Sequence, residues 1–345
     1  MLRLWRAPTL LAVTALGTAV LAIALTGCVN PAYQRLTAPD AQLSPAHSRP
    51  VRVSLPASPA SYFGVFEPSI PKSYSQVARF GRAVGTAPNL VLEYTYWGEP
   101  FPIDFARQAA AHGATMVVDL DPTGPSVEAI ADGSQDGYLE DFAYSVRKFG
   151  GPVIVSFGHE MNGNWYSWGF THTSPKVFVR AWRHIVTVFR DIGADNVTWL
   201  WTINVLGVDV PPVRAWWPGA SYVTWAGIDG YVAQAGESYY GVFGPGVAAI
   251  RKITADPILI AETAVGQVAG QAATIPGLFA GLRQQHLLGL IWFDEAQSGG
   301  LYAQDWRLEG HAAAEAAFRR SVRRYLDLAP PATQLSGRIS VSPPP

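Results

Sequence analysis

Two glutamates end short apolar runs, at positions where a carboxylate could do chemistry. Glu160 lies in the stretch 157–169, FGHEMNGNWYSWG, which follows the apolar run 152–156, and Glu262 directly follows the run 257–261. An unpaired carboxylate is expensive to bury, so each side chain should point toward a specific partner or a site. Two carboxylates facing each other across a cleft suit glycoside hydrolysis, in which one protonates the leaving oxygen and the other attacks or stabilises the anomeric carbon. Carboxylates that only pair with arginines or cap helices would fit the same pattern.

Eight short apolar, β-branched or aromatic runs bounded by Gly, Pro, Asp or Asn predict strands. They lie at residues 62–66, 90–96, 114–120, 153–157, 197–201, 226–230, 258–261 and 289–293. The segments between them carry helical signals, the clearest being Ser174-Pro175, an apolar stripe and then Gly193. Strand alternating with helix predicts an α/β fold, favouring a (β/α)8 TIM barrel over a doubly wound open sheet.

In such a barrel the C-terminal strand ends meet at one mouth, where polar and aromatic side chains gather. Glu160 after the fourth strand and Glu262 at the end of the seventh can therefore face each other. The chemistry asks for different pKa values: one carboxyl must be protonated near neutral pH, and the other must stay ionised with the help of hydrogen bonds.

The stretch from Gly158 to Gly169 resembles the acid/base signature of glycoside hydrolase family 26, which includes β-mannanases, mixed-linkage β-glucanases and some β-1,3-xylanases. The resemblance extends from about residue 62 to residue 310, through the segments 64–68, 196–201, 227–231, 260–262 and 291–293. It implies a retaining, endo-acting (β/α)8 enzyme without a cofactor, with Glu160 as the acid/base and Glu262 as the nucleophile.

The resemblance also implies roles for neighbouring residues. Tyr231 would donate a hydrogen bond to Glu262, and His159 would shape the subsite that holds the sugar at the point of cleavage. The aromatic candidates for the cleft are Trp165 and Trp292, which would stack on sugar rings, and Trp168 and Trp97, which could extend it or only pack. Asn162 and Asn204 could bind sugar hydroxyls or only order their loops.

Two departures from the mannanase pattern concern the outer subsites. Phe293 stands where an arginine is expected after the strand-eight tryptophan, and Asp119 and Asp121 stand where a histidine is expected near the third strand end. β-1,4-Mannan is the first expectation for the substrate. A mixed-linkage β-glucan, a transglycosylase activity and a non-catalytic, lipid-tethered carbohydrate-binding protein are the alternatives.

The N-terminal 28 residues predict export. Arg3 and Arg6 precede an apolar stretch, and the segment 25–28, Leu-Thr-Gly-Cys, resembles a bacterial lipobox that would make Cys28 the lipid attachment site. An ordinary signal peptide or an uncleaved anchor helix is the alternative. Residues 29–60 are expected to form a Pro/Ser/Ala-rich tether, residues 61–328 the catalytic domain and residues 329–345 a disordered tail. The expected location is outside the cytoplasmic membrane, held by the lipid anchor or secreted.

Composition and motifs argue against other classes of function. The net charge is −1 without a basic cluster, which disfavours nucleic acid. The zinc pattern H-E-x-x-H fails because its second histidine is replaced by Gly163, and no metal site is expected. A loose G-x-G-x-x-A match at 244–249 follows a poor strand. The expected partner is a polysaccharide, the only membrane contact is the lipid anchor, and a monomer is expected.

Overall fold

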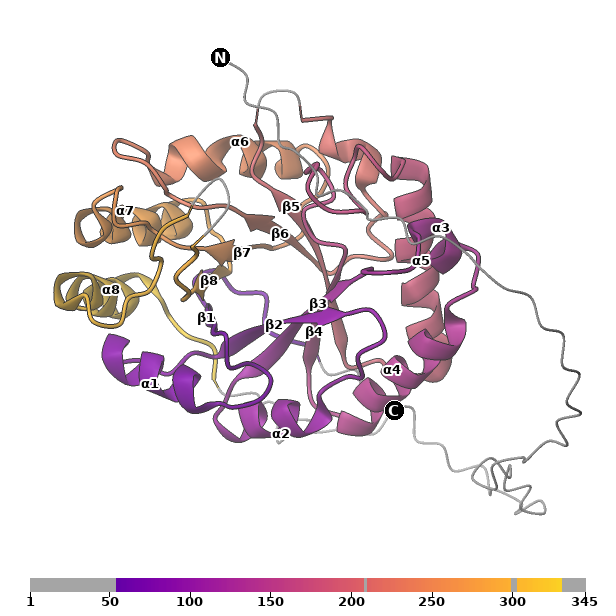
Figure 1. Ribbon diagram of the computed structural model, residues 1–345. Coiled ribbons are helices and arrows are strands. Elements are labelled where there is room, and N and C mark those ends of the chain that lie inside the picture. The colour runs from indigo at the N-terminus through magenta and orange to yellow at the C-terminus, as the bar shows by residue number, and fades with distance from the viewer. Residues whose placement is uncertain (1–53, 208–209, 299–302, 331–345) are drawn as a thin grey trace, which may run out of the picture. The chain divides into compact units, whose positions relative to one another are not determined.

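The computed structural model describes residues 54–207, 210–298 and 303–330. Eight parallel strands close into a barrel in which each strand pairs with its neighbour in sequence and β8 returns to β1 (Figure 1). The strands are β1 (Tyr62–Phe66), β2 (Leu90–Tyr96), β3 (Thr115–Asp121), β4 (Val153–Phe157), β5 (Val197–Asn204), β6 (Trp225–Asp229), β7 (Ile258–Thr263) and β8 (Gly289–Phe293). The predicted barrel is confirmed and the open sheet is wrong, because the pairing of β1 with β8 leaves no sheet edge.

Helices surround the barrel in the order that the sequence predicts (Figure 1). They are α1 (Ser75–Val84), α2 (Ile103–Ala111), α3 (Val127–Ala131), α4 (Asp136–Phe149), α5 (Pro175–Ile192), α6 (Tyr239–Arg251), α7 (Gln271–Gln284) and α8 (Ala312–Tyr325), with the 3-10 turn η2 (Val213–Trp216). The start and end predicted for α5 are confirmed: Ser174 caps the first turn and Gly193, with φ 78°, ends the helix. The G-x-G-x-x-A match lies inside α6, away from any strand-to-helix turn, which contradicts a dinucleotide-binding loop.

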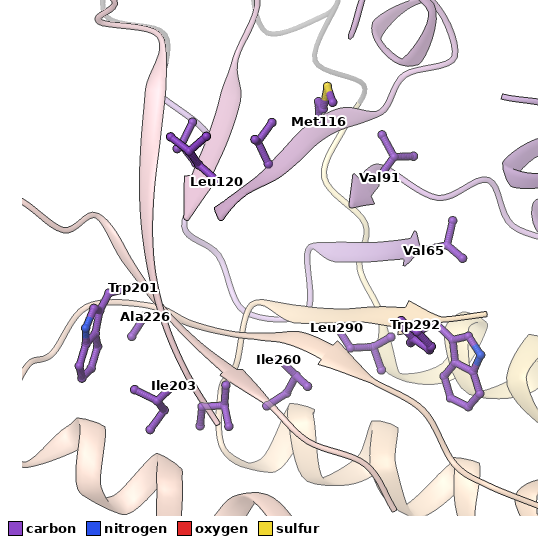
Figure 2. Packing of buried hydrophobic residues seen from close by; sticks show 14 of the residues in the cluster. Val65, Val91, Met116, Leu120, Trp201, Ile203, Ala226, Ile260, Leu290 and Trp292 are labelled. Atoms are coloured by element: carbon purple, nitrogen blue, oxygen red, sulfur yellow. The ribbon is translucent and has the colours of Figure 1, made fainter. Parts of the chain in front are cut away.

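Each strand carries buried side chains on both of its faces, and these side chains form two separate layers. Side chains such as Leu92, Val117, Leu259 and Ile291 fill the barrel interior. Those at the alternate positions, which Figure 2 shows, pack outward against the helices. Strand alternation thus decides whether a side chain can reach the mouth or is buried in the outer layer.

Both ends of the domain close the bottom of the barrel. Leu55 is buried against the interior layer, and the Tyr62 hydroxyl donates to the Pro56 carbonyl over 2.6 Å. The Ala329 N–H donates to the Ser61 carbonyl over 2.8 Å. Residues 55 and 56 of the predicted tether and residue 329 of the predicted tail thus contact the barrel. Cys28 and the rest of the leader lie outside the described residues, among which no helix is long and apolar enough to span a membrane.

Candidate active site

A cavity of about 1120 Å³ opens at the C-terminal ends of β4 to β7. Six of the predicted site residues line it: Glu160, Glu262, Asn162, Asn204, Trp165 and Tyr231. Its wall is completed by further residues of the same loops, among them Tyr166, Phe170, Leu206, Glu237 and Gln297. The structure thus brings both carboxylates into one space.

Glu160 reaches the cavity through an unusual backbone conformation. Gly158 and Glu160 have φ values of 54° and 55°, in the left-handed region that a residue with a side chain rarely adopts. The Glu160 N–H donates to the Thr202 carbonyl of β5 over 3.1 Å, which holds this turn against the neighbouring strand. Strained backbone of this kind persists where the surrounding structure fixes it, and it often marks a functional site.

The Glu160 carboxylate accepts one hydrogen bond at each oxygen. Asn204 donates from Nδ2 to Oε1, and Trp165 donates from Nε1 to Oε2 over 2.8 Å. Asn162 holds Asn204 in turn, since its amide bonds both the backbone carbonyl and the N–H of Asn204, over 2.9 and 2.8 Å. Of the two roles left open for the asparagines, the structure supports bracing of the Glu160 loop.

Gly163 makes room for this arrangement. A Cβ atom at this position would lie 2.3 Å from the Trp165 indole, too close for any real contact. The indole folds back over the glycine, places its N–H on Glu160 and leaves 53% of the Trp165 residue exposed. The N-G-N-W segment therefore lets one tryptophan contact the carboxylate and still present a surface to the cavity.

Glu262 reaches the mouth because β7 changes register near its end. Ile228 of β6 pairs with Ile260, but the next residue, Asp229, pairs with Glu262, so β7 carries one additional residue here. By simple alternation after the inward-facing Ala261, Glu262 would point toward the helices. A bulge of this kind re-aims a side chain, and bulges are common beside active sites.

Two tyrosines hold the Glu262 carboxylate. Tyr94 donates to Oε2 and Tyr231 donates to Oε1. Burial raises the pKa of Glu262 to about 8, whereas the two donors act in the opposite direction because they stabilise the ionised form. Burial also raises the pKa of Tyr231 well above its ordinary value, so this hydroxyl remains a donor at neutral pH. The bond from Tyr231 is the one expected from the sequence.

His159 and Trp168 form a buried layer behind the cavity, which corrects their predicted roles. His159 is 2% exposed, with Nδ1 3.0 Å from Asp121 Oδ1 and Nε2 3.2 Å from Tyr166 Oη. Burial of the ring opposes its charge, but the carboxylates of Asp121 and Asp119 outweigh this and raise the pKa of His159 well above its ordinary value. Both ring nitrogens are occupied, so His159 supports Tyr166 rather than a sugar.

Trp168 stacks on Tyr166 with ring centroids 4.3 Å apart, and its Nε1 donates to the His159 carbonyl over 2.7 Å. At 2% exposure it does not extend the cleft. The predicted cleft residue is a packing residue, because its ring covers the back of Tyr166 and cannot also face a ligand.

Two other predicted tryptophans lie away from the cavity. Trp292 is fully buried in the outer layer (Figure 2). It packs edge-on against Phe318 of α8. Its predicted stacking on sugar is wrong, because Trp292 follows the inward-facing Ile291 and therefore points to the helices. Trp97 is half-buried, donates from Nε1 to Gln135 over 3.0 Å, and is not part of the cavity wall.

Sequence reasoning missed Tyr94 as a residue of the site. Tyr94 shares the inward face of β2 with Leu90 and Leu92, and this period-two pattern could have revealed it. Asp229, at the end of β6, is 1% exposed, and neither of its oxygens has a hydrogen-bond partner among the described residues. Burial, and then the charge of Glu160, raise the pKa of Asp229 well above its ordinary value. Among the described residues, no group of three or more His, Cys, Asp or Glu side chains could hold a metal ion.

A closed (β/α)8 barrel with one glutamate after β4 and another on β7, both open to one cavity, defines a protein of the glycoside hydrolase type. The family model described as Glycosyl hydrolase family 26 matches residues 124–319, and the chain belongs to this family.

Several proteins are similar to this chain. Endoglucanase H of Acetivibrio thermocellus is 27% identical over 72% of this chain and 29% of its own length. A mannan endo-1,4-beta-mannosidase of Bacillus subtilis is 29% identical over 31% of this chain and 28% of its own length. The chain thus spans less than a third of either relative. A solved Cellulomonas fimi endo-beta-1,4-mannanase double mutant superposes with a TM-score of 0.63 at 17% identity, covering 81% of this chain and 73% of that one, and supports the fold.

Proposed function

We propose that this protein hydrolyses internal bonds of a β-linked polysaccharide with retention of configuration. The observation that carries the proposal is that Glu160 and Glu262 line one cavity with different partners. Membership in the family supports the same chemistry.

In the first step, the Glu160 carboxyl gives its proton to the glycosidic oxygen while a Glu262 oxygen attacks the anomeric carbon. The bond to the leaving sugar breaks, and its electron pair stays on the protonated oxygen. In the second step, Glu160 takes a proton from water, which attacks the same carbon and releases Glu262. Tyr94 and Tyr231 stabilise the charged carboxylate before the first step and after the second.

The cavity suits a polymer. Its volume of about 1120 Å³ is above the usual range of sites for small ligands, which end near 1,000 Å³. The exposed Trp165 face offers an apolar surface on which the C–H face of a sugar can pack. Room for several sugar units beside the carboxylates supports cleavage within a chain.

β-1,4-Mannan is the first proposed substrate. Support comes from similar proteins of Caldalkalibacillus mannanilyticus, Bifidobacterium adolescentis and Bacillus subtilis, all of them mannan endo-1,4-beta-mannosidases. A β-glucan is the second candidate, because Endoglucanase H matches a far larger part of this chain. Phe293, in place of the arginine expected in mannanases, leaves the choice between the two candidates open.

The test is release of reducing ends from β-mannan, mixed-linkage β-glucan and β-1,3-xylan by the chain from residue 29 onward. Glu160→Ala and Glu262→Ala should each lower kcat by about 100-fold or more, whereas Glu128→Ala, on the exposed surface of α3, should leave it unchanged. With an aryl glycoside as substrate and azide added, the Glu160 variant should give a β-azide and the Glu262 variant an α-azide. This difference distinguishes the acid/base from the nucleophile. Binding of a polymer without cleavage by the unaltered protein would favour a carbohydrate-binding protein, and lengthened products would favour transglycosylation.

We further propose that residues 1–28 form a lipoprotein signal and that a lipid on Cys28 anchors a monomer outside the cytoplasmic membrane. Expression of the full chain in a bacterium, followed by fractionation, tests this proposal. Cys28→Ala should move the protein out of the membrane fraction, and a protein that stays there would indicate an uncleaved anchor helix.

A further inference from the structure

The two tyrosines that hold Glu262 are themselves joined by a pair of phenylalanines. Phe66 ends β1 and Phe293 ends β8, and their rings stack with centroids 4.9 Å apart and planes 16° from parallel. Tyr94 meets Phe66 edge-on at 5.0 Å, and Tyr231 meets Phe293 edge-on at 5.8 Å. With the two hydrogen bonds to Glu262, these contacts close a ring of five side chains, here called the nucleophile ring.

The ring members come from five different parts of the barrel mouth. Tyr94 is on β2, Phe66 on β1, Phe293 on β8, Glu262 on β7, and Tyr231 follows β6. The Phe66–Phe293 stack lies at the junction where the barrel closes, and the backbone fixes it there: Phe66 pairs with Phe293 in register, and the Asp294 N–H donates to the Phe66 carbonyl over 3.0 Å. The stack is therefore a rigid part of the ring.

We propose that Phe66 and Phe293 are positioning residues, whose stacked rings hold the Tyr94 and Tyr231 hydroxyls on the two oxygens of Glu262. A tyrosine hydroxyl lies far from its backbone, so the direction of its bond depends on what supports the ring. Edge-to-face contacts have a preferred geometry and provide that support on one side of each tyrosine. The inference deepens the proposed function, on which it rests for the role of Glu262.

The arrangement also assigns Phe293 a structural role, the support of Tyr231. An arginine at this position would bring a charged group beside Tyr231, whose hydroxyl donates to Glu262, whereas phenylalanine contributes only a ring. The ring supports Tyr231 without adding a charge to the site. The choice of phenylalanine therefore leaves the ionisation of Glu262 to burial and to the two hydroxyl donors.

The experiment replaces each phenylalanine by leucine, in Phe293→Leu and Phe66→Leu, and measures the titration of Glu262 by NMR with 13C-labelled glutamate. The Glu262→Gln spectrum assigns the signal. Phe63→Leu is the matched control, because Phe63 lies on the same strand β1 but packs outward against Phe80 and Phe318. The titratable groups in contact with Glu262 are Tyr94 and Tyr231. His159 packs against Tyr94, and the titratable groups that act on Tyr231 are Glu160, Asp229, Tyr166 and Glu295. The substitutions change none of them.

Each leucine variant should raise the pKa of Glu262, by roughly half a unit to one unit, because less well-oriented donors stabilise the carboxylate less. The acid limb of kcat/KM should move by the same amount, while the control moves neither. Two variants on different strands keep the test open if one fails to fold. An unchanged titration of Glu262 in a folded variant would overturn the inference even if the protein cleaves a polysaccharide. A shifted titration without cleavage would support the ring and count against the proposed function.

Discussion

The two glutamates of the cavity are held in contrasting ways. Glu160 sits on a strained turn and accepts N–H donors from the amide of Asn204, at the end of β5, and from the indole of Trp165, both of which line the cavity. Glu262 sits on a strand, is 9% exposed, and accepts O–H donors from two tyrosines that the nucleophile ring supports. Glu160 thus depends on a tryptophan that is half exposed to the cavity, whereas the tyrosines of Glu262 pack against the stacked phenylalanines of β1 and β8.

The contrast matches the two tasks. A nucleophile must meet one carbon atom at short range, which favours a rigid position. An acid/base must exchange a proton in both steps, and its partners can change as the substrate arrives. If the difference in support is also a difference in function, removing donors from Glu262 should have larger effects than removing one from Glu160.

The largest effect is expected for the tyrosine hydroxyls. Tyr94→Phe and Tyr231→Phe each remove one donor from Glu262 and retain the ring. Each should lower kcat/KM by about 10-fold, and the double variant by about 100-fold, since a hydrogen bond to a charged group contributes about 1.5–3 kcal/mol. Because the ionised form loses support, the acid limb of the pH profile should move to higher pH. Tyr240→Phe, an exposed tyrosine of α6, is the control. An acid limb that does not move would show that the hydroxyls do not stabilise the carboxylate.

A smaller effect is expected at Glu160. Trp165→Phe retains an aromatic face but removes the indole N–H that donates to Oε2. The kcat should fall by roughly 3- to 10-fold, in line with the net contribution of one hydrogen bond. The KM should change little, because the stacking surface remains. Trp168→Phe is the matched control, because it removes an N–H that donates to the His159 carbonyl and not to Glu160. If KM rises and kcat is unchanged, Trp165 acts through sugar contact alone.

Much of this architecture could be predicted from the sequence, because local patterns record it. Strand positions follow from short apolar runs, and the predicted starts of the strands agree within one residue with those of the structure. The ends of β5 and β7 were placed too early, since Thr202, Asn204 and Thr263 are polar. Those polar ends are the part of a barrel strand that faces the site.

The site itself was predicted less well, because long-range contacts decide it. Trp168, in the loop after β4, and Trp292, on β8, have the right residue type near the barrel mouth, but their rings are buried. The register shift that turns Glu262 inward depends on how β6 pairs with β7, which no local pattern shows. Tyr94 lies 168 positions from Glu262 along the chain. Only the closed barrel brings these two side chains together.

The smallest effect is expected beside the nucleophile ring, where Glu67 and Asp294 form a buried carboxyl pair at the β1–β8 junction. Burial, and then the charge of Asp294, raise the pKa of Glu67 to about 9. Burial raises the pKa of Asp294 to about 7. The folded protein therefore keeps protons that the unfolded chain has released. As the pH rises from about 4.5 toward 9, this pair makes the fold progressively less stable relative to the unfolded chain.

Glu67→Gln stays neutral at every pH and should remove the Glu67 part of this loss. Thermal unfolding should show a Tm about 2–4 °C above the unaltered protein at pH 9 and nearly equal to it at pH 5, since 1 kcal/mol shifts Tm by roughly that amount in a domain of this size. Glu128→Gln, on the exposed surface of α3, should change Tm at neither pH. The same Tm difference at both values would mean that Glu67 is ionised throughout. The β1–β8 junction next to the nucleophile ring would then carry a charge at both pH values.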